Sequence, residues 1–97
     1  MLESHIEDKL RRGVHALGGL SYKLVPVVAG LPDRLVLLPG GRVAFVELKQ
    51  AGQRPRPEQL AVHRKLRARG ADVVVLAGPD EVATWLQERG ADEGREV

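Results

Sequence analysis

Three side chains with evident chemistry stand at either end of a short apolar stretch of this sequence. Asp33 ends the segment Gly-Leu-Pro-Asp, and Glu47 and Lys49 belong to the later segment Phe-Val-Glu-Leu-Lys. Two carboxylates held close together repel strongly unless a proton or a cation sits between them. If the fold brings Asp33 and Glu47 together, the pair predicts a divalent cation bound through oxygen atoms, with a lysine ammonium nearby.

The residues between these acids have the pattern of a β-hairpin. Residues 34–38 and 42–48 are apolar runs with β-branched side chains, and Pro-Gly-Gly at positions 39–41 separates them. With a three-residue loop, paired positions sum to 80, which sets Asp33 opposite Glu47 with their Cβ atoms about 5 Å apart. Lys49 then projects from the same face, about 7 Å further along. A register sum of 81 would break this pairing, so the prediction depends on the turn type.

Hydrophobic periodicity predicts an α/β fold. Positions 6, 10, 14 and 17 are apolar and form one stripe of an amphipathic helix. Residues 72–77 lack polar alternation, which predicts a fully buried strand, and the helix before them predicts a parallel pairing with the strand that carries Glu47. The predicted elements are a helix over 3–17, strands over 22–28, 34–38 and 42–48, a helix from 57 or 58 to 69, a strand over 72–77 and a helix over 81–89.

Length and composition limit the architecture. The 97 residues suffice for one domain, predicted over residues 1–89, followed by an acidic tail at 90–97 that is expected to be disordered. The absence of cysteine excludes disulfides and thiolate metal sites. No apolar run reaches membrane-spanning length and residues 1–8 do not have the pattern of a signal peptide, so a cytoplasmic protein is expected.

Positive charge is concentrated in the middle of the chain. The formal net charge is +2, yet residues 49–69 contain seven basic residues and one acidic residue. This distribution favours a polyanionic partner. The alternative is a solvated helix that is rich in arginine without binding a polyanion.

Four polar residues occupy helix positions where apolar residues would be expected. Glu3 and Glu7 fall on the apolar stripe of the first helix, and Gln59 and His63 share the inward face of the second helix. A buried carboxylate needs a cation, a donor or water. The simpler alternatives are acids that favour the start of a helix, a half-buried amide and a histidine at the edge of the core.

Taken in order, these features resemble the PD-(D/E)xK nuclease superfamily and, within it, the stand-alone VRR-NUC (virus-type replication-repair nuclease) domains. The resemblance rests on an N-terminal helix with glutamate, the Gly-Leu-Pro-Asp segment, the Glu-x-Lys strand, a basic loop and a helix with Gln59 near its start. It extends through His63 and Gly70 to the strand at 73–76, and covers about residues 3–86. It implies a restriction-endonuclease-like core, a mixed central sheet flanked by helices in the order α-β-β-β-α-β-α.

The resemblance also implies a metal-dependent phosphodiesterase. Asp33, Glu47 and the backbone carbonyl of Leu48 would ligate Mg²⁺ or Mn²⁺, while Lys49 would position the attacking water. Glu7 is the first candidate for a further catalytic and metal-binding acid from the N-terminal helix, and Glu3 is the alternative. The other candidate residues are Gln59 as catalytic support, Gly30, Pro32 and His63 as motif support, and Arg34, Arg54, Arg56, Arg64 and Lys65 as DNA contacts.

The partners that the resemblance implies are DNA, branched as in a Holliday junction, and a second copy of the chain. The setting would be a bacterial or phage-infected cell, without an organic cofactor or a membrane. We expect the apolar surface that a second copy covers to lie on the first helix or near Trp85 and Leu86. The alternative functions are a non-catalytic nucleic-acid-binding module with the same fold and a purely structural α/β dimer.

Overall fold

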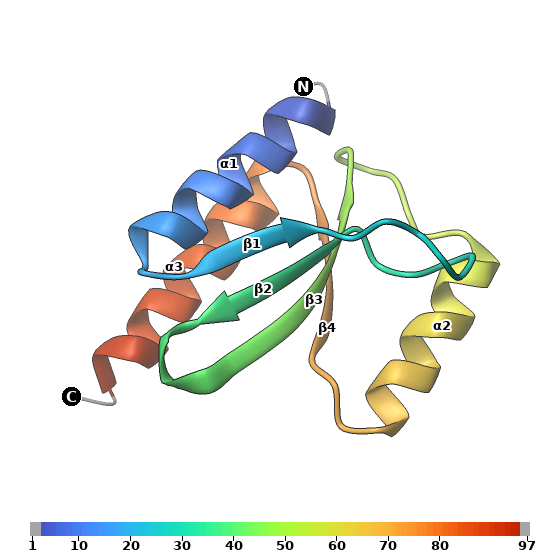
Figure 1. Cartoon of the computed structure of the whole chain (residues 1–97). Coiled ribbons are helices and arrows are strands. Elements are labelled where there is room, and N and C mark those ends of the chain that lie inside the picture. The colour runs from blue at the N-terminus through green and yellow to red at the C-terminus, as the bar shows by residue number, and fades with distance from the viewer. Residues whose placement is uncertain (1–2, 96–97) are drawn as a thin grey trace.

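The computed structural model describes residues 3–95, with side chains for residues 4–91. Within this range a mixed four-stranded sheet has helices on both faces (Figure 1). The element order agrees with the predicted α-β-β-β-α-β-α arrangement. The elements are α1 (Glu3–Ala16), β1 (Leu20–Lys23), β2 (Arg34–Leu38), the short 3₁₀ turn η1 (Pro39–Gly41), β3 (Arg42–Lys49), α2 (Pro57–Ala68), β4 (Val73–Ala77) and α3 (Pro79–Arg95).

The strands lie in the order β1-β2-β3-β4. The pairs β1–β2 and β2–β3 are antiparallel, as hairpin-type connections require, whereas β3–β4 is parallel. The crossover through α2 makes this parallel pairing possible, and it confirms the direction that the sequence predicted for β4.

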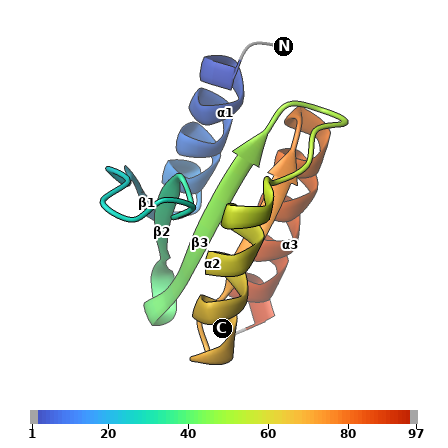
Figure 2. The same ribbon diagram turned by 90° about the vertical axis from the view of Figure 1, so that its right-hand side faces the viewer.

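The two faces of the sheet carry different layers. Helices α1 and α3 cover one face, and α2 lies on the other (Figure 2). Gly13 lets α1 approach α3 closely, because a Cβ at this position would overlap the side chain of Leu86. The core between α1, α3 and the sheet is made of Ile6, Leu10, Val14, Val36, Leu38, Ala44, Val46, Leu48, Leu76, Val82 and Trp85.

Two strand predictions are wrong in detail. The first strand ends at Lys23 instead of continuing to residue 28, because Pro26 offers no N–H for a ladder and the valines around it face solvent. Strand β4 is only partly buried, with Val73 and Leu76 buried and the residues between them half-buried. Strand β4 lies at the edge of the sheet, and both of its faces are partly covered by other elements. This explains why its residues are apolar without being fully buried.

The last helix is longer than the sequence predicted. Helix α3 continues past Arg89 to Arg95 and so includes residues 90–95 of the expected tail, while residues 96–97 lie outside the described part. Gly90 does not interrupt it, and a Cβ there would lie 3.2 Å from Leu17, so this turn packs next to α1. Across the described residues, no helix combines the length and apolarity needed to cross a membrane.

Candidate metal centre

The β2–β3 hairpin has the register that places the two acids opposite one another. Arg34 pairs with Val46 and Leu38 pairs with Arg42, so paired positions sum to 80 as predicted. The turn between the strands contains Gly40 and Gly41, both at positive φ, which side chains other than glycine rarely adopt. Because Asp33 directly precedes β2, continuing this register by one residue brings Asp33 opposite Glu47.

Asp33 is fixed to both neighbouring strands. Its Oδ2 accepts a hydrogen bond of 2.8 Å from the backbone N–H of Leu48, and its carbonyl accepts one of 2.8 Å from Leu24. In an extended strand, the N–H and C=O of one residue point to the same side. The Leu48 carbonyl therefore also points toward Asp33, beyond the end of the β2 ladder.

Glu47 is the buried acid of the pair, with only 1 % of its surface exposed. Its Oε2 accepts a hydrogen bond of 3.1 Å from Gln59 Nε2 and lies 3.8 Å from the Lys49 ammonium. Its Oε1 is buried and has no hydrogen-bond partner among the described residues, and the Nε2 atom of His63 lies 3.6 Å from it. One oxygen of Glu47 thus remains available to a ligand.

Burial, reinforced by the nearby Asp33, raises the pKa of Glu47 to about 8, while the charges of Lys49 and Arg56 oppose the shift. A carboxylate pair in this setting holds a proton until a cation replaces it. Burial also lowers the pKa of His63, reinforced by the charge of Arg67. His63 is therefore neutral near pH 7 and adds no positive charge beside Glu47.

Gln59 connects α2 to the site. It stands at the third position of the helix, where its Oε1 accepts a hydrogen bond of 2.8 Å from the backbone N–H of Arg56. This contact closes the first turn and fixes the amide, which leaves Nε2 directed at Glu47. Gln59 is buried rather than half-buried, and the two hydrogen bonds that satisfy its amide are the ones that support the site.

The Gly-Leu-Pro-Asp segment sets the approach of the β1–β2 loop to α2. Gly30 has φ of +92°, and a Cβ there would overlap the Glu58 carbonyl oxygen. Glycine is needed here both for conformation and for space. Pro32 is fully buried directly before Asp33. Gly30 and Pro32 therefore fix the backbone that leads into Asp33, which explains their place in the same motif.

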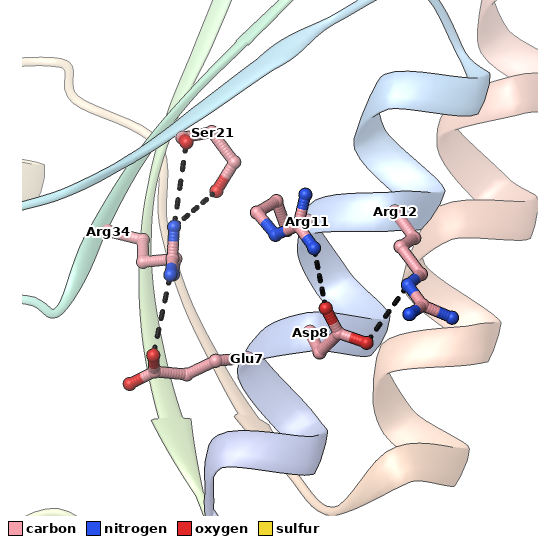
Figure 3. A network of polar contacts seen from close by, with 6 residues as sticks. All are labelled: Glu7, Asp8, Arg11, Arg12, Ser21 and Arg34. Atoms are coloured by element: carbon pink, nitrogen blue, oxygen red, sulfur yellow. Dashed lines mark hydrogen bonds and ion pairs between the residues drawn. The ribbon is translucent and has the colours of Figure 1, made fainter.

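Arg34 and Glu7 lie on the other face of the sheet. Arg34 pairs with the core-facing Val46, so its side chain is buried under α1 and only 8 % of the residue is exposed. Its Nη2 lies 3.4 Å from Glu7 Oε2 and its Nη1 lies 3.2 Å from Ser21 Oγ. Figure 3 shows the three side chains directed toward one another. The prediction that Arg34 contacts DNA is therefore wrong, because alternation along β2 turns its guanidinium away from the surface.

The structure does not bring Glu7 to the Asp33–Glu47 pair. Among the described residues, no three His, Asp or Glu side chains form a group that could hold a metal ion. The side chain of Glu3, the alternative acid, lies outside the described residues. The described donors at the pair are two carboxylates and the Leu48 carbonyl, all hard oxygens that suit Mg²⁺ or Mn²⁺. The unpartnered Glu47 Oε1 fits such an ion.

The other candidate DNA contacts are exposed. Arg54 and Arg56 lie in the loop that joins β3 to α2, and Arg64 and Lys65 lie on α2 itself. Sequence reasoning missed one feature beside the start of α2, the loop of residues 25–28, because it assigned these residues to a strand. Pro26 within the apolar run is the signal that identifies this loop.

Comparisons with known proteins agree on one family, although no family model matches. A curated relative is "Putative nuclease p44" of Acyrthosiphon pisum secondary endosymbiont phage 1, 47 % identical over 79 residues that cover 80 % of this chain and 85 % of the relative. A solved structure described as "VRR_NUC domain" has a TM-score of 0.81 and 37 % identity, covering 88 % of this chain and 94 % of its own. A "VRR_NUC domain protein" at 18 % identity shares the fold, with a TM-score of 0.72 and coverage of 91 % and 87 %.

Proposed function

Because this chain belongs to the VRR-NUC nuclease family, we propose that it is a metal-dependent endonuclease that hydrolyses phosphodiester bonds in DNA at Asp33 and Glu47. The observation that carries the proposal is the buried Glu47, whose Oε1 has no hydrogen-bond partner among the described residues and whose neighbour is a second carboxylate. Such a pair is costly to bury unless a cation joins it.

Each residue of the centre has a distinct task in this proposal. Asp33, Glu47 and the Leu48 carbonyl would hold Mg²⁺ or Mn²⁺, which would supply an acidified water and neutralise charge on the phosphate. Lys49, whose ammonium lies 3.8 Å from Glu47 Oε2, orients the water and stabilises the phosphate. Gln59 keeps Glu47 in place through its 3.1 Å hydrogen bond.

A cleavage assay tests the proposal against the non-catalytic alternative. Purified protein is incubated with labelled linear, flapped and four-way DNAs in Mg²⁺, Mn²⁺ or EDTA. We expect cleavage with Mn²⁺ and none with EDTA, and faster cleavage of branched substrates. Binding to all of these DNAs without cleavage in either metal would support the nucleic-acid-binding module instead.

Binding to DNA is expected to depend on the exposed arginines of the loop between β3 and α2. Changing Arg54 and Arg56 together to Ala should weaken binding and flatten the log-log salt dependence by up to roughly 2, because each phosphate contact releases a counterion. Fluorescence anisotropy at several salt concentrations measures this slope. Arg11 and Arg12 on α1 provide the control, since their double Ala variant loses equal charge on the opposite face of the sheet. If the Arg11 and Arg12 variant changed binding and its salt slope equally, Arg54 and Arg56 could not be assigned as DNA contacts.

The proposed homodimer needs an apolar surface, and the exposed apolar side chains favour a different face from the one that the sequence predicted. The apolar stripe of α1 and Trp85 are buried in the core. Leu20, Tyr22 and Val43 are instead exposed. Their register places them on the sheet face that also carries Glu47. A second copy that covers this face would hold two metal centres at a fixed separation.

Light scattering should therefore give about twice the 10.6 kDa chain mass at micromolar concentration. Tyr22→Glu should shift the mass toward that of one chain, because it buries a charge in the contact. Leu60→Glu, a similar change at an exposed residue of α2, is the matched control. A monomeric wild-type protein that still cuts DNA would exclude the dimer and leave the nuclease standing.

A further inference from the structure

The loop between β1 and β2 exposes an unusual amount of apolar surface. Val25 is 77 % exposed, Val27 is 86 % exposed and Val28 is 54 % exposed. Single exposed valines are common on protein surfaces, but three within four residues form a patch that a protein rarely leaves in water without a partner. The metal centre and the proposed dimer face do not use these side chains.

This loop has a defined shape. The N–H of Val27 donates a hydrogen bond of 2.9 Å to the carbonyl of Val25, and that of Leu31 donates one of 3.2 Å to Val28. Pro26 restricts the backbone between them. At the base of the loop, Leu24 donates to the carbonyl of Asp33 over 2.8 Å. The valines are thus presented on a turn whose base is tied to a metal-binding residue.

The loop also borders the metal centre from the side of α2. Gly30 packs so closely on the first turn of α2 that a Cβ would overlap the Glu58 carbonyl. Figures 1 and 2 both show the segment between β1 and β2 running beside the start of α2. Arg56, which directly precedes α2, is exposed there and close enough to lower the pKa of Glu47. A DNA strand held by Arg56 with a phosphate at Glu47 would lie alongside the valines.

We propose that residues 25–28 are an apolar wedge that packs against bases left unstacked at a branch point of DNA. The inference rests on the proposed nuclease function and extends it to the way in which branched DNA is selected. Valine side chains offer no charge to phosphate, so their contact is with base faces, as apolar wedges make when they enter between base steps. Intact linear duplex presents no such faces, so the wedge favours branched substrates.

The occupant is a set of bases and not a second copy of the chain for two reasons. Arg56, which directly precedes the turn of α2 that Gly30 contacts, complements a phosphate backbone rather than another basic surface. In addition, the sheet face with Leu20, Tyr22 and Val43 already offers a separate exposed apolar surface to a second copy.

Binding in EDTA tests the wedge without cleavage. Four-way DNA carries 2-aminopurine at the branch, and a linear duplex carries it in the middle; the fluorescence of this base rises when it unstacks. We expect the wild-type protein to raise the branch signal and to bind the branched DNA more tightly than the duplex. The double variant Val25→Ser with Val27→Ser should lose the rise and bind branched DNA about tenfold more weakly. Its affinity for the duplex should stay within about twofold of wild type.

Two further variants complete the test. Leu60→Ser removes an exposed apolar side chain of α2, outside both the loop and the proposed dimer face, and should behave as wild type. Val27→Phe, with a larger apolar side chain, should strengthen the branch signal. Unchanged branch binding in the double serine variant would overturn the proposal, and so would a shift of that variant from dimer to monomer, which would assign the loop to a second copy. Cleavage that persists in Asp33→Asn would reject the proposed metal centre. It would not decide the wedge, which the fluorescence measurement in EDTA tests independently.

Discussion

Replacing Asp33 by Asn, or Glu47 by Gln, is expected to abolish Mn²⁺-dependent DNA cleavage while leaving the fold intact. Each change removes one of the two carboxylates that the hairpin register sets opposite one another. The Asn side chain retains an oxygen that can accept the Leu48 N–H, so the 2.8 Å contact at the end of β2 need not be lost. What disappears is the negative charge that binds a divalent cation. The loss should therefore appear in activity and in metal affinity, but little in secondary structure.

Lys49→Ala should lower the cleavage rate by a factor on the order of 10² or more, because its ammonium assists the water and the phosphate without holding the metal. Metal affinity, measured by calorimetry, should change much less in this variant than in Asp33→Asn. Asp72→Asn supplies the control, since Asp72 is an exposed acid directly before β4. Full activity in Asp33→Asn would contradict the assignment of the metal centre.

The hairpin could be predicted from the sequence because local chemistry determines it. Two β-branched runs, a turn with two glycines and alternation with a period of two leave few registers, and the observed sum of 80 is one of them. The contribution of Gln59 was also predictable in outline, because helix periodicity turns it toward the sheet. Its role as a cap for the first turn of α2 depends on a backbone contact to Arg56 that no sequence pattern specifies.

The side-chain contacts between α1 and the sheet could not be predicted in the same way. Periodicity places Glu7 on the inward arc of α1, but it does not say which residue meets it there. In the fold this partner is Arg34, whose side chain is carried under α1 by the same alternation that turns Asp33 to the opposite face. The exposed loop at 25–28 was missed for a related reason. Its composition is that of a strand, and only Pro26 and the absence of a pairing partner exclude one.

The stability of the metal-free protein should fall as pH rises, because of Glu47. Burial raises its pKa to about 8 in the folded protein, against the ordinary glutamate value of 4.5 in the unfolded chain. Between these values the folded state binds more protons than the unfolded state, so the free energy of unfolding decreases with pH, by up to roughly 1.4 kcal/mol per unit from this group. Above about pH 8 both states are ionised and the contribution levels off.

Glu47→Gln removes this titration and keeps the shape of the side chain. In EDTA at pH 8, the variant should therefore be more stable than the wild-type protein, and the difference should vanish toward pH 4.5. Urea unfolding at one-unit pH steps measures both curves, and their difference cancels the other titrating groups. Mn²⁺ should stabilise the wild-type protein at pH 8 and leave the variant nearly unchanged, because only the folded carboxylate pair binds it. If the free energy of unfolding changed with pH in the same way for both proteins, Glu47 would be ionised in the folded protein without metal. Burial of this acid would then not favour cation binding.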